Sequence, residues 1–549
     1  MKRLKKSGLI LTCLLLMVSM LAACSGNGNK NSNEKGPAES SKPEATNSGT
    51  AGEDNPYKEP MEISIAFWDI EGELAKVEKD PIVQEILNKF NITIKPVNTT
   101  WDDYGQKIQM WAASGQLPDV FAIDAMGTQY QRKWIDQGVV APLPDLAKYP
   151  NLAEYFKAPD IEGLAVDGKH YTIPRRMFPS VDWSALDRVV MYRWDLAQAA
   201  GITKEPDTWE EFKAMLDAIV KADPEGKNIT GVTAAQVKMI GGLFWLYGNP
   251  VATSDGSGAD FKWIKEDGQF IPAVFSQHAL PAVQNMKDMY DKKLIDPDIA
   301  LTSPDIAYDK FASGKAAAML GGGGFINMDQ NVYAKRWANS YPEKDVLESI
   351  KVLKPLKGPD GQRHHAIFKT YWSESYFSGK IDSKKLDRIL ALYDYVLSPE
   401  GKALITYGKE GVDYKVEGDQ KVMLDKTPHA QKYPATAFLK NLVAYETADA
   451  YNMSNPQISH EGIRQEAVNY IDWILNNTKV PDYDIRLTYM STPTKDKFTI
   501  FDHDDLLNVM LSKESAEQAW QKVVDGYKAK GLDKMIEEVN MKANELGIE

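Results

Sequence analysis

The sequence predicts an α/β protein with more than one domain, and three observations support this prediction. The chain has 549 residues, more than one ordinary hydrophobic core accommodates. Its composition, 43% apolar and 26% charged, is that of a globular protein. Segments with strand and helix patterns alternate from residue 61 onward. This alternation is typical of a parallel sheet covered by helices.

The N-terminus predicts export and a lipid anchor. Four basic residues within positions 2–6 precede an apolar run at Leu9–Leu21, which is shorter than the roughly 20 residues of a bilayer span and suits a signal peptide. "LAAC" at 21–24 resembles the lipobox of bacterial lipoproteins. That resemblance implies cleavage before Cys24 and lipid attachment to it, on the extracellular face of the cell membrane. A plain N-terminal membrane anchor is the alternative.

A tether and the first strands follow the anchor. Residues 25–56 have almost nothing to bury, so we expect a flexible tether. The next segments alternate between strand and helix patterns, and Gly115 is the expected stop of the second helix. We expect strands at 61–66, 91–99 and 118–124, and helices over 82–90 and 104–116.

Later segments continue the α/β pattern. Thr208 and Glu211 have the spacing of a capping box, which predicts a helix start. Ser398-Pro399 predicts that a second helix begins there, because Pro suits the first helical position. We also expect a strand pair at 168–176, a strand at 189–194 followed by a helix to Gly201, and a C-terminal helix that includes Trp520 and ends at Gly531.

Charge and motifs exclude several functions. A net charge of -13 argues against a nucleic-acid binder. His364 and His365 are adjacent, so on a strand they face opposite sides and cannot chelate together. The loop at 221–231 has too few oxygen ligands for calcium, and no cofactor motif is present. Carboxylate pairs stay open, because 77 acidic residues make accidental pairs common.

Five segments together resemble the extracellular solute-binding proteins of ABC importers, family 1, which are maltose-binding-protein-like. The resemblance is to the Gram-positive lipoprotein branch and rests on "ASGQLPDVFAID", "DGKHYTIPRR", "VVMYRWDLAQAAGITKEPDTWEEF", "FASGKAAAMLGGGGF" and "LYDYVLSPEGKALITYGKEGVDY". It implies a two-lobed periplasmic-binding-protein-like fold of class II. A ligand cleft between hinged lobes is then expected.

The carboxyl ends of parallel strands supply the candidate site, because α/β sheets bind ligands there. Aromatic rings bury the apolar faces of sugars, while carboxylates and arginines bond their hydroxyls. We expect core packing for most tryptophans, but ligand contact for Trp68 and Trp372. The candidate ligand-binding residues are Trp68, Asp69, Glu71, Asp124, Arg175, Arg176, Trp245, Tyr247, Phe325, Tyr371, Trp372 and Glu374.

Two features leave alternatives open. Arg175 and Arg176 suggest an acidic oligosaccharide, because guanidinium groups hold carboxylates bidentately, but a hinge salt bridge to one of the many carboxylates is the alternative. Only one of the two can face the cleft. The glycines of "MLGGGGF" at 319–325 indicate either a ligand-lining loop or a flexible turn.

The sequence thus predicts a monomeric, lipid-anchored protein that captures a carbohydrate for the permease of an ABC importer, without catalysis. The alternatives are a lipid-anchored glycosidase or lyase, a sensor or structural lipoprotein, or a solute such as a peptide. The expected boundaries are 1–23 for the signal peptide, 24–57 for the lipidated cysteine and tether, 58–176 and 366–415 for lobe 1, and 177–365 and 416–549 for lobe 2.

Overall fold

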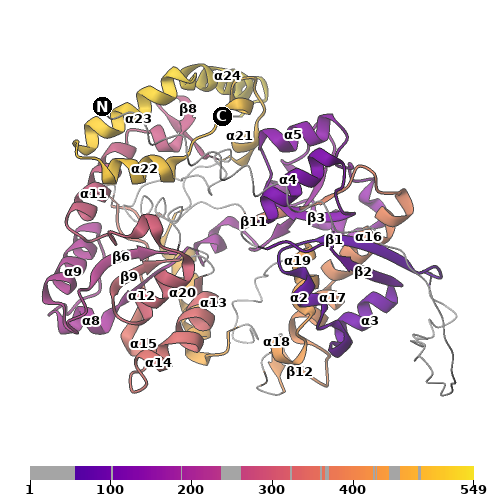
Figure 1. Ribbon diagram of the computed structural model, residues 1–549, viewed down its shortest axis with the longest axis horizontal. Helices are drawn as coiled ribbons and strands as arrows, with labels where there is room; N and C mark the ends of the chain where they lie inside the picture. The colour runs from indigo at the N-terminus through magenta and orange to yellow at the C-terminus, as the bar shows by residue number, and fades with distance from the viewer. Residues whose placement is uncertain are drawn as a thin grey trace, which may run out of the picture. The chain divides into compact units, whose positions relative to one another are not determined.

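The computed structural model describes most of the chain from residue 56 onward (Figure 1). The described residues are 56–548, apart from 101–102, 187, 236–260, 322–323, 359–360, 365–369, 419, 425–426, 428, 444–457 and 480–483. Within these ranges, no helix is long and apolar enough to cross a membrane. The expected anchor at Cys24 and the tether as far as residue 55 lie outside them.

A five-stranded sheet forms the centre of the first lobe, in the order β2-β1-β3-β11-β4. The central strand β1 pairs in parallel with β2 and β3, as the alternation of strands and helices predicts. β11 is antiparallel to both β3 and β4, so β4 is an edge strand. The strands are β1 (Met61–Ala66), β2 (Ile92–Pro96), β3 (Val120–Ile123), β4 (Thr172–Arg176) and β11 (Tyr371–Phe377).

Local sequence explains where the first helices begin and end. The Asp80 carboxylate caps α3 by accepting hydrogen bonds from two backbone N–H groups, and Pro81 occupies the first turn. α4 ends at Gly115, whose φ of 67° is the left-handed conformation predicted for that stop. The helices of this lobe are α2 (Ile70–Leu74), α3 (Pro81–Lys89), α4 (Tyr104–Ser114), α5 (Gln129–Asp136), α6 (Pro150–Tyr155), α7 (Pro159–Glu162), α16 (Ser383–Leu397), α17 (Pro399–Tyr407), α18 (His429–Lys432) and α19 (Thr436–Val443).

Both faces of this sheet are buried. Ile63 and Ile65 point into a core that includes residues of α3, α16 and α19. Phe121 and Ile123 point into a second core with Ile108 of α4. α19 packs in the first of these cores, although residues after 415 were assigned from the sequence to the second lobe.

A four-stranded sheet forms the centre of the second lobe, in the order β10-β5-β9-β6. β9 is antiparallel to β5 and parallel to β6. The strands are β5 (Val190–Arg193), β6 (Thr230–Ala234), β9 (Ala316–Leu320) and β10 (Ile350–Val352). Two hairpins stand apart from both sheets, β7 (Trp263–Glu266) with β8 (Gln269–Pro272), and β12 (Tyr414–Glu417) with β13 (Gln420–Met423).

Helices of the second lobe cover this sheet and continue to the C-terminus. The capping box at Thr208 and Glu211 is formed as predicted. The described helices of the second lobe are α8 (Trp194–Ala199), α9 (Trp209–Ala222), α11 (Ala279–Asp291), α12 (Pro304–Ala312), α13 (Gly324–Asn327), a π-helical segment (Met328–Trp337), α14 (Ala338–Ser340), α15 (Val346–Ser349), α20 (Glu461–Asn477), α21 (Ile485–Tyr489), α22 (Asp502–Leu511), α23 (Ala516–Ala529) and α24 (Leu532–Glu545).

The sequence prediction was wrong in one local detail. Residues 168–176 were expected to form a strand pair, but only 172–176 form a strand, and it joins the large sheet. Val166 and Lys169 make a single bridge around the Asp-Gly turn instead. A long-range partner, β11, therefore takes the hydrogen bonds that a local hairpin would have used.

Candidate functional site

Three predicted site residues meet in the first lobe: Trp68 from the segment after β1, Arg175 from β4 and Trp372 from β11. The rings of Trp68 and Trp372 lie 5.1 Å apart with an interplanar angle of 50°. The guanidinium carbon of Arg175 is 4.2 Å from the ring centre of Trp68 and 5.0 Å from that of Trp372. A cation in this position is attracted by the electron-rich ring faces.

Arg175 is held inside the protein by hydrogen bonds as well as by rings. Its side chain is fully buried. Nη1 donates to the backbone carbonyl of Asn441 at 3.2 Å, and Nη2 donates to Ser373 Oγ. Arg175 thus joins β4, β11 and α19. This supports the interpretation of Arg175 as a structural arginine, and the two acceptors named here are neutral groups.

A backbone irregularity in β11 positions two of these partners. The pairing of β11 with β4 shifts register between Tyr371 and Glu374. Ser373 lies in this bulge with a φ of 52°, which non-glycine residues rarely adopt. Trp372, beside it, is half-buried. The bulge therefore aims neighbouring side chains of one strand at Arg175 and Trp68.

Glu374 and Asp124 lie at adjacent strands but face different surroundings. Glu374 is fully buried, and its carboxylate accepts a hydrogen bond from the backbone N–H of Ala125 at 3.1 Å. Asp124 is half-buried, and its backbone carbonyl accepts from the Tyr130 hydroxyl at 3.2 Å. Burial raises the pKa of Tyr130, and the nearby Asp124 adds to that effect. The Tyr130 hydroxyl therefore remains a neutral donor at physiological pH.

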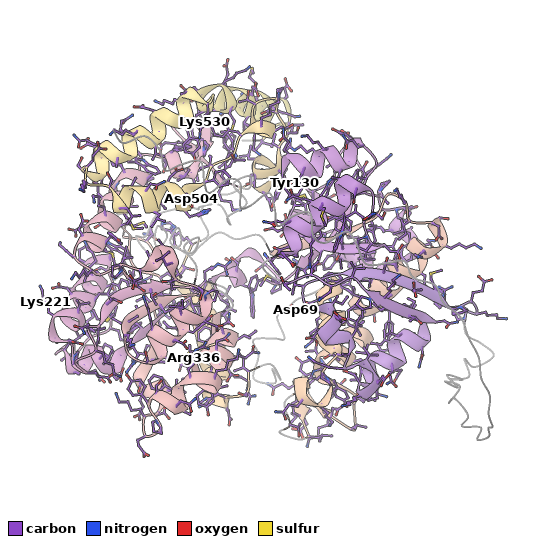
Figure 2. All side chains as sticks on the ribbon, in the orientation of Figure 1. Asp69, Tyr130, Lys221, Arg336, Asp504 and Lys530 are labelled. Carbon is purple, nitrogen blue, oxygen red and sulfur yellow. The ribbon has the colours of Figure 1, made fainter. Side chains whose placement is uncertain are left out.

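Two further candidates follow β1 and are accessible. Asp69 and Glu71 are exposed (Figure 2 labels Asp69 and Tyr130). Asp69 has a φ of 56°, and its N–H donates to Thr99 at 2.7 Å, so the chain turns sharply at the end of β1. Their positions leave both carboxylates available to hydroxyl groups.

The remaining candidates do not join this group. Tyr371 and Phe325 are each 1% exposed, and Phe325 packs in the second lobe against Tyr470 at 5.4 Å. Packing is the role that the structure supports for both. Trp245 and Tyr247 lie outside the described residues.

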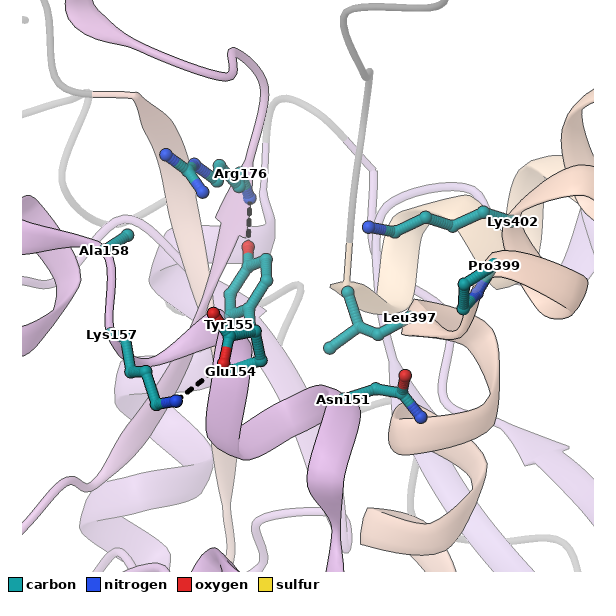
Figure 3. A pocket seen from close by; sticks show the side chains of 9 residues that line it. All are labelled: Asn151, Glu154, Tyr155, Lys157, Ala158, Arg176, Leu397, Pro399 and Lys402. Carbon is teal, nitrogen blue, oxygen red and sulfur yellow. Dashed lines mark hydrogen bonds and ion pairs between the residues drawn. The ribbon is translucent and has the colours of Figure 1, made fainter. Parts of the chain in front are cut away.

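Arg176 lies on a different side of β4 from Arg175. Its backbone N–H donates to the Tyr155 hydroxyl at 2.7 Å, and its Nη2 donates to the Pro179 carbonyl at 2.7 Å. Arg176 lines a cavity of 470 Å³ together with residues of α6 and α17 (Figure 3). Arg175 is not among the described residues that line this cavity.

Arg176 is the one predicted site residue among the described residues that line this cavity; sequence reasoning missed the others, including Tyr155, Lys157 and Lys402. Lys402 is separated from Arg176 by more than two hundred residues and is brought near it only by the fold. The predicted helix start at Ser398-Pro399 is confirmed, with Ser398 Oγ accepting from the Gly401 N–H at 3.0 Å. That cap fixes where Lys402 emerges, but no local pattern marks it as a site residue.

The loop at 221–231 uses its carboxylates internally. Asp223 accepts from the backbone N–H groups of Lys227 and Asn228, both at 3.0 Å. Lys227 Nζ donates to Glu225 at 2.7 Å. Burial alone would raise the pKa of Glu225, but hydrogen bonds from Lys227 and Tyr341 hold it below its usual value. Among the described residues, no group of three or more metal-ligating side chains has metal-site geometry.

Comparison with known proteins places the chain among binding proteins. The family model of the bacterial extracellular solute-binding proteins matches residues 74–403. The polygalacturonan/rhamnogalacturonan-binding protein YtcQ of Bacillus subtilis (strain 168) is 25% identical over 393 residues, which cover 69% of this chain and 72% of that protein.

Solved structures agree on the fold. The alginate-binding protein AlgQ2, solved without calcium ion, superposes with a TM-score of 0.65 at 17% identity, covering 88% of this chain and 98% of AlgQ2. The ABC-transporter substrate-binding protein FusA of S. pneumoniae, an EF-hand mutant with fructo-nystose, gives 0.62 at 16% identity, covering 89% and 99%. The predicted two-lobed fold is confirmed. The family model matches more than half of the 549 residues of this chain. The chain therefore belongs to the bacterial extracellular solute-binding proteins.

Proposed function

We propose that this protein captures an oligosaccharide outside the cell and delivers it to the permease of an ABC importer. One observation carries the carbohydrate part. The half-buried Trp372 ring lies beside Trp68 at the site end of the first sheet, with the exposed carboxylates of Asp69 and Glu71 nearby along the chain. An accessible aromatic face with polar groups around it suits the C–H face and hydroxyl rim of a sugar.

The relatives support the same class of ligand. The names of YtcQ, AlgQ2 and FusA give polygalacturonan or rhamnogalacturonan, alginate and fructo-nystose as their ligands. Two of these three names specify acidic polysaccharides, which supports the expectation of an acidic ligand from Arg175 and Arg176. Because Arg175 is buried, we assign this role to Arg176.

A ligand screen tests the proposal. Mature protein is heated with oligogalacturonates, alginate oligomers and fructo-oligosaccharides, and a saturable rise in melting temperature is expected for at least one class, by mass action. Chromatography of the recovered sugar should show unchanged chain length. No rise with any carbohydrate would contradict the proposal, and shortened chains would favour the enzyme alternative.

Variants of tryptophan then locate the site. Trp372→Ala should weaken binding of the oligosaccharide found in that screen by about tenfold or more, which corresponds to about 1.4 kcal/mol. Trp111→Ala is the matched control, because Trp111 is also half-buried but lies near the end of α4 that leads into the start of β3. Equal loss in both variants would point to instability rather than to a lost contact.

The anchor is proposed separately. We infer that lipid on Cys24 holds the mature protein at the membrane surface, because a basic start, a short apolar run and "LAAC" precede the tether. Cys24→Ala should move the protein from the membrane fraction to the soluble fraction with ligand affinity unchanged. Membrane retention of this variant would favour the plain apolar anchor.

A further inference from the structure

The cavity lies beside β4, at the edge of the first sheet. β4 is an edge strand, so its outward backbone groups need partners. The buried Tyr155 hydroxyl supplies one: it accepts from the Arg176 N–H at 2.7 Å and lies 2.7 Å from the Pro174 carbonyl oxygen. With this edge satisfied, the cavity beside it is lined by side chains rather than by open strand.

The lining of the cavity is basic. Arg176 comes from β4, Lys157 from the segment after α6, and Lys402 from α17 (Figure 3). Among the lining residues that the structure describes, Glu154 is the only carboxylate, and it pairs with Lys157 at 2.7 Å. Three cations against one carboxylate is unusual in a chain whose net charge is -13. The local excess of positive charge favours an anion.

Arg176 keeps hydrogen-bonding capacity for that anion. Nη2 is used by the Pro179 carbonyl, as described above. Nε is buried and has no hydrogen-bond partner within the part of the chain that the structure describes. A buried donor without a partner costs about 1–3 kcal/mol, which a bound acceptor would recover. The guanidinium of Arg176 is therefore held through Nη2, while its Nε–H can donate to a bound anion.

The size of the cavity indicates more than a bare ion. Its 470 Å³ falls within the range of about 300–1,000 Å³ typical of small-molecule sites. Asn151 and Leu397 add an amide and an apolar surface to the lining. We propose that this cavity binds a carboxylate carried on a small organic molecule, with Arg176 and Lys402 as the groups that bind it.

Two sources offer that carboxylate, a uronate unit of the carbohydrate ligand and a free organic acid. The uronate source rests on the proposed carbohydrate capture, whereas the free-acid source does not. The neutral alternative, a cavity filled only by water, predicts no dependence on Arg176.

Nuclear magnetic resonance of arginine Nε–H groups tests the proposal directly. The Arg176 signal is assigned by its absence in Arg176→Gln, and galacturonate, trigalacturonate and acetate are titrated in turn. A saturable shift of this signal is expected with galacturonate or trigalacturonate. A shift with acetate as well identifies a free-acid site, and a shift with the uronates alone identifies a uronate site.

Calorimetry of variants supplies the second readout. Arg176→Gln and Lys402→Gln should each weaken galacturonate or trigalacturonate binding by about tenfold, since each removes a charge-assisted contact. Lys133→Gln, which removes an exposed charge from α5, is the matched control and should bind as the wild type does. If either pocket variant fails to fold, the other still carries the test.

The outcomes separate this inference from the proposed function. Wild-type affinity in both pocket variants, with no shift of the Arg176 signal by any of the three probes, overturns the carboxylate site even if neutral oligosaccharides bind. A shift with acetate in a protein that binds no carbohydrate upholds the site while the proposed function fails.

Discussion

Two neighbouring arginines of β4 occupy opposite kinds of surroundings. Arg175 is fully buried beside two tryptophan rings that also contact each other, and it donates to Ser373 and to the Asn441 carbonyl. Arg176 borders a cavity and retains a buried Nε–H without a partner among the described residues. The same residue type, one position apart, thus supports the sheet on one side and a binding pocket on the other. Alternation along a strand is sufficient to separate these roles.

Replacing Arg175 should give the largest loss of stability. Arg175→Ala leaves the Asn441 carbonyl and Ser373 hydroxyl without this donor and leaves a cavity beside the rings of Trp68 and Trp372. We expect a loss of about 3 kcal/mol in the free energy of unfolding, measured by urea denaturation. A loss below about 1 kcal/mol would contradict a structural role for Arg175.

The next effect concerns the hydroxyl that closes the strand edge. Tyr155→Phe removes the acceptor of the Arg176 N–H and the donor beside the Pro174 carbonyl. We expect a loss of about 2 kcal/mol in the free energy of unfolding. Tyr171→Phe is a suitable control, because Tyr171 is only partly buried and precedes β4. An equal loss in the control would show that the strand edge is not what the Tyr155 hydroxyl stabilises.

The dependence of stability on alkaline pH tests the same Tyr155 hydroxyl, with a smaller expected effect. Burial raises the pKa of Tyr155 above its ordinary value of 10. The folded protein therefore holds this proton where the unfolded chain releases it, and stability falls as pH rises above 10. Between pH 10 and 11 the wild type should lose about 1 kcal/mol more than Tyr155→Phe, measured by urea denaturation at each pH. Parallel losses would mean that the Tyr155 hydroxyl titrates normally.

The smallest expected effect on stability belongs to Arg176. Arg176→Gln should change the free energy of unfolding by no more than about 0.5 kcal/mol, because its side chain is only partly buried and makes one described hydrogen bond to the backbone. A loss as large as that of Arg175→Ala would mean that Arg176 has a structural role like that of Arg175.

Much of the fold could be predicted because it depends on local signals. The stop of α4 at Gly115, the capping box at Thr208 and the helix start at Ser398-Pro399 are all encoded within a few residues. The strand pair expected at 168–176 failed because β4 pairs with β11, about two hundred residues away. Pairing over such a separation leaves no mark in the local pattern.

The candidate site divides in the same way. Strand-end reasoning selected Trp68, Trp372, Arg175 and Arg176, and three of these do meet. Which arginine faces inward could not be known, because a register shift in β11 and the position of α19 decide it. Lys157 follows a helix and Lys402 lies on one, and neither carries a sequence signal, because a charged residue in such a place is normally solvated.

Calorimetric titration of trigalacturonate into the wild type and into Arg176→Gln tests the proposed carboxylate site. We propose that Arg176 binds the carboxylate of an acidic carbohydrate, whereas Arg175 supports β4 and the neighbouring tryptophans. Saturable binding by the wild type, about tenfold weaker in a variant of unchanged melting temperature, is the predicted result. Equal affinities, or no saturable binding by the wild type, would contradict it.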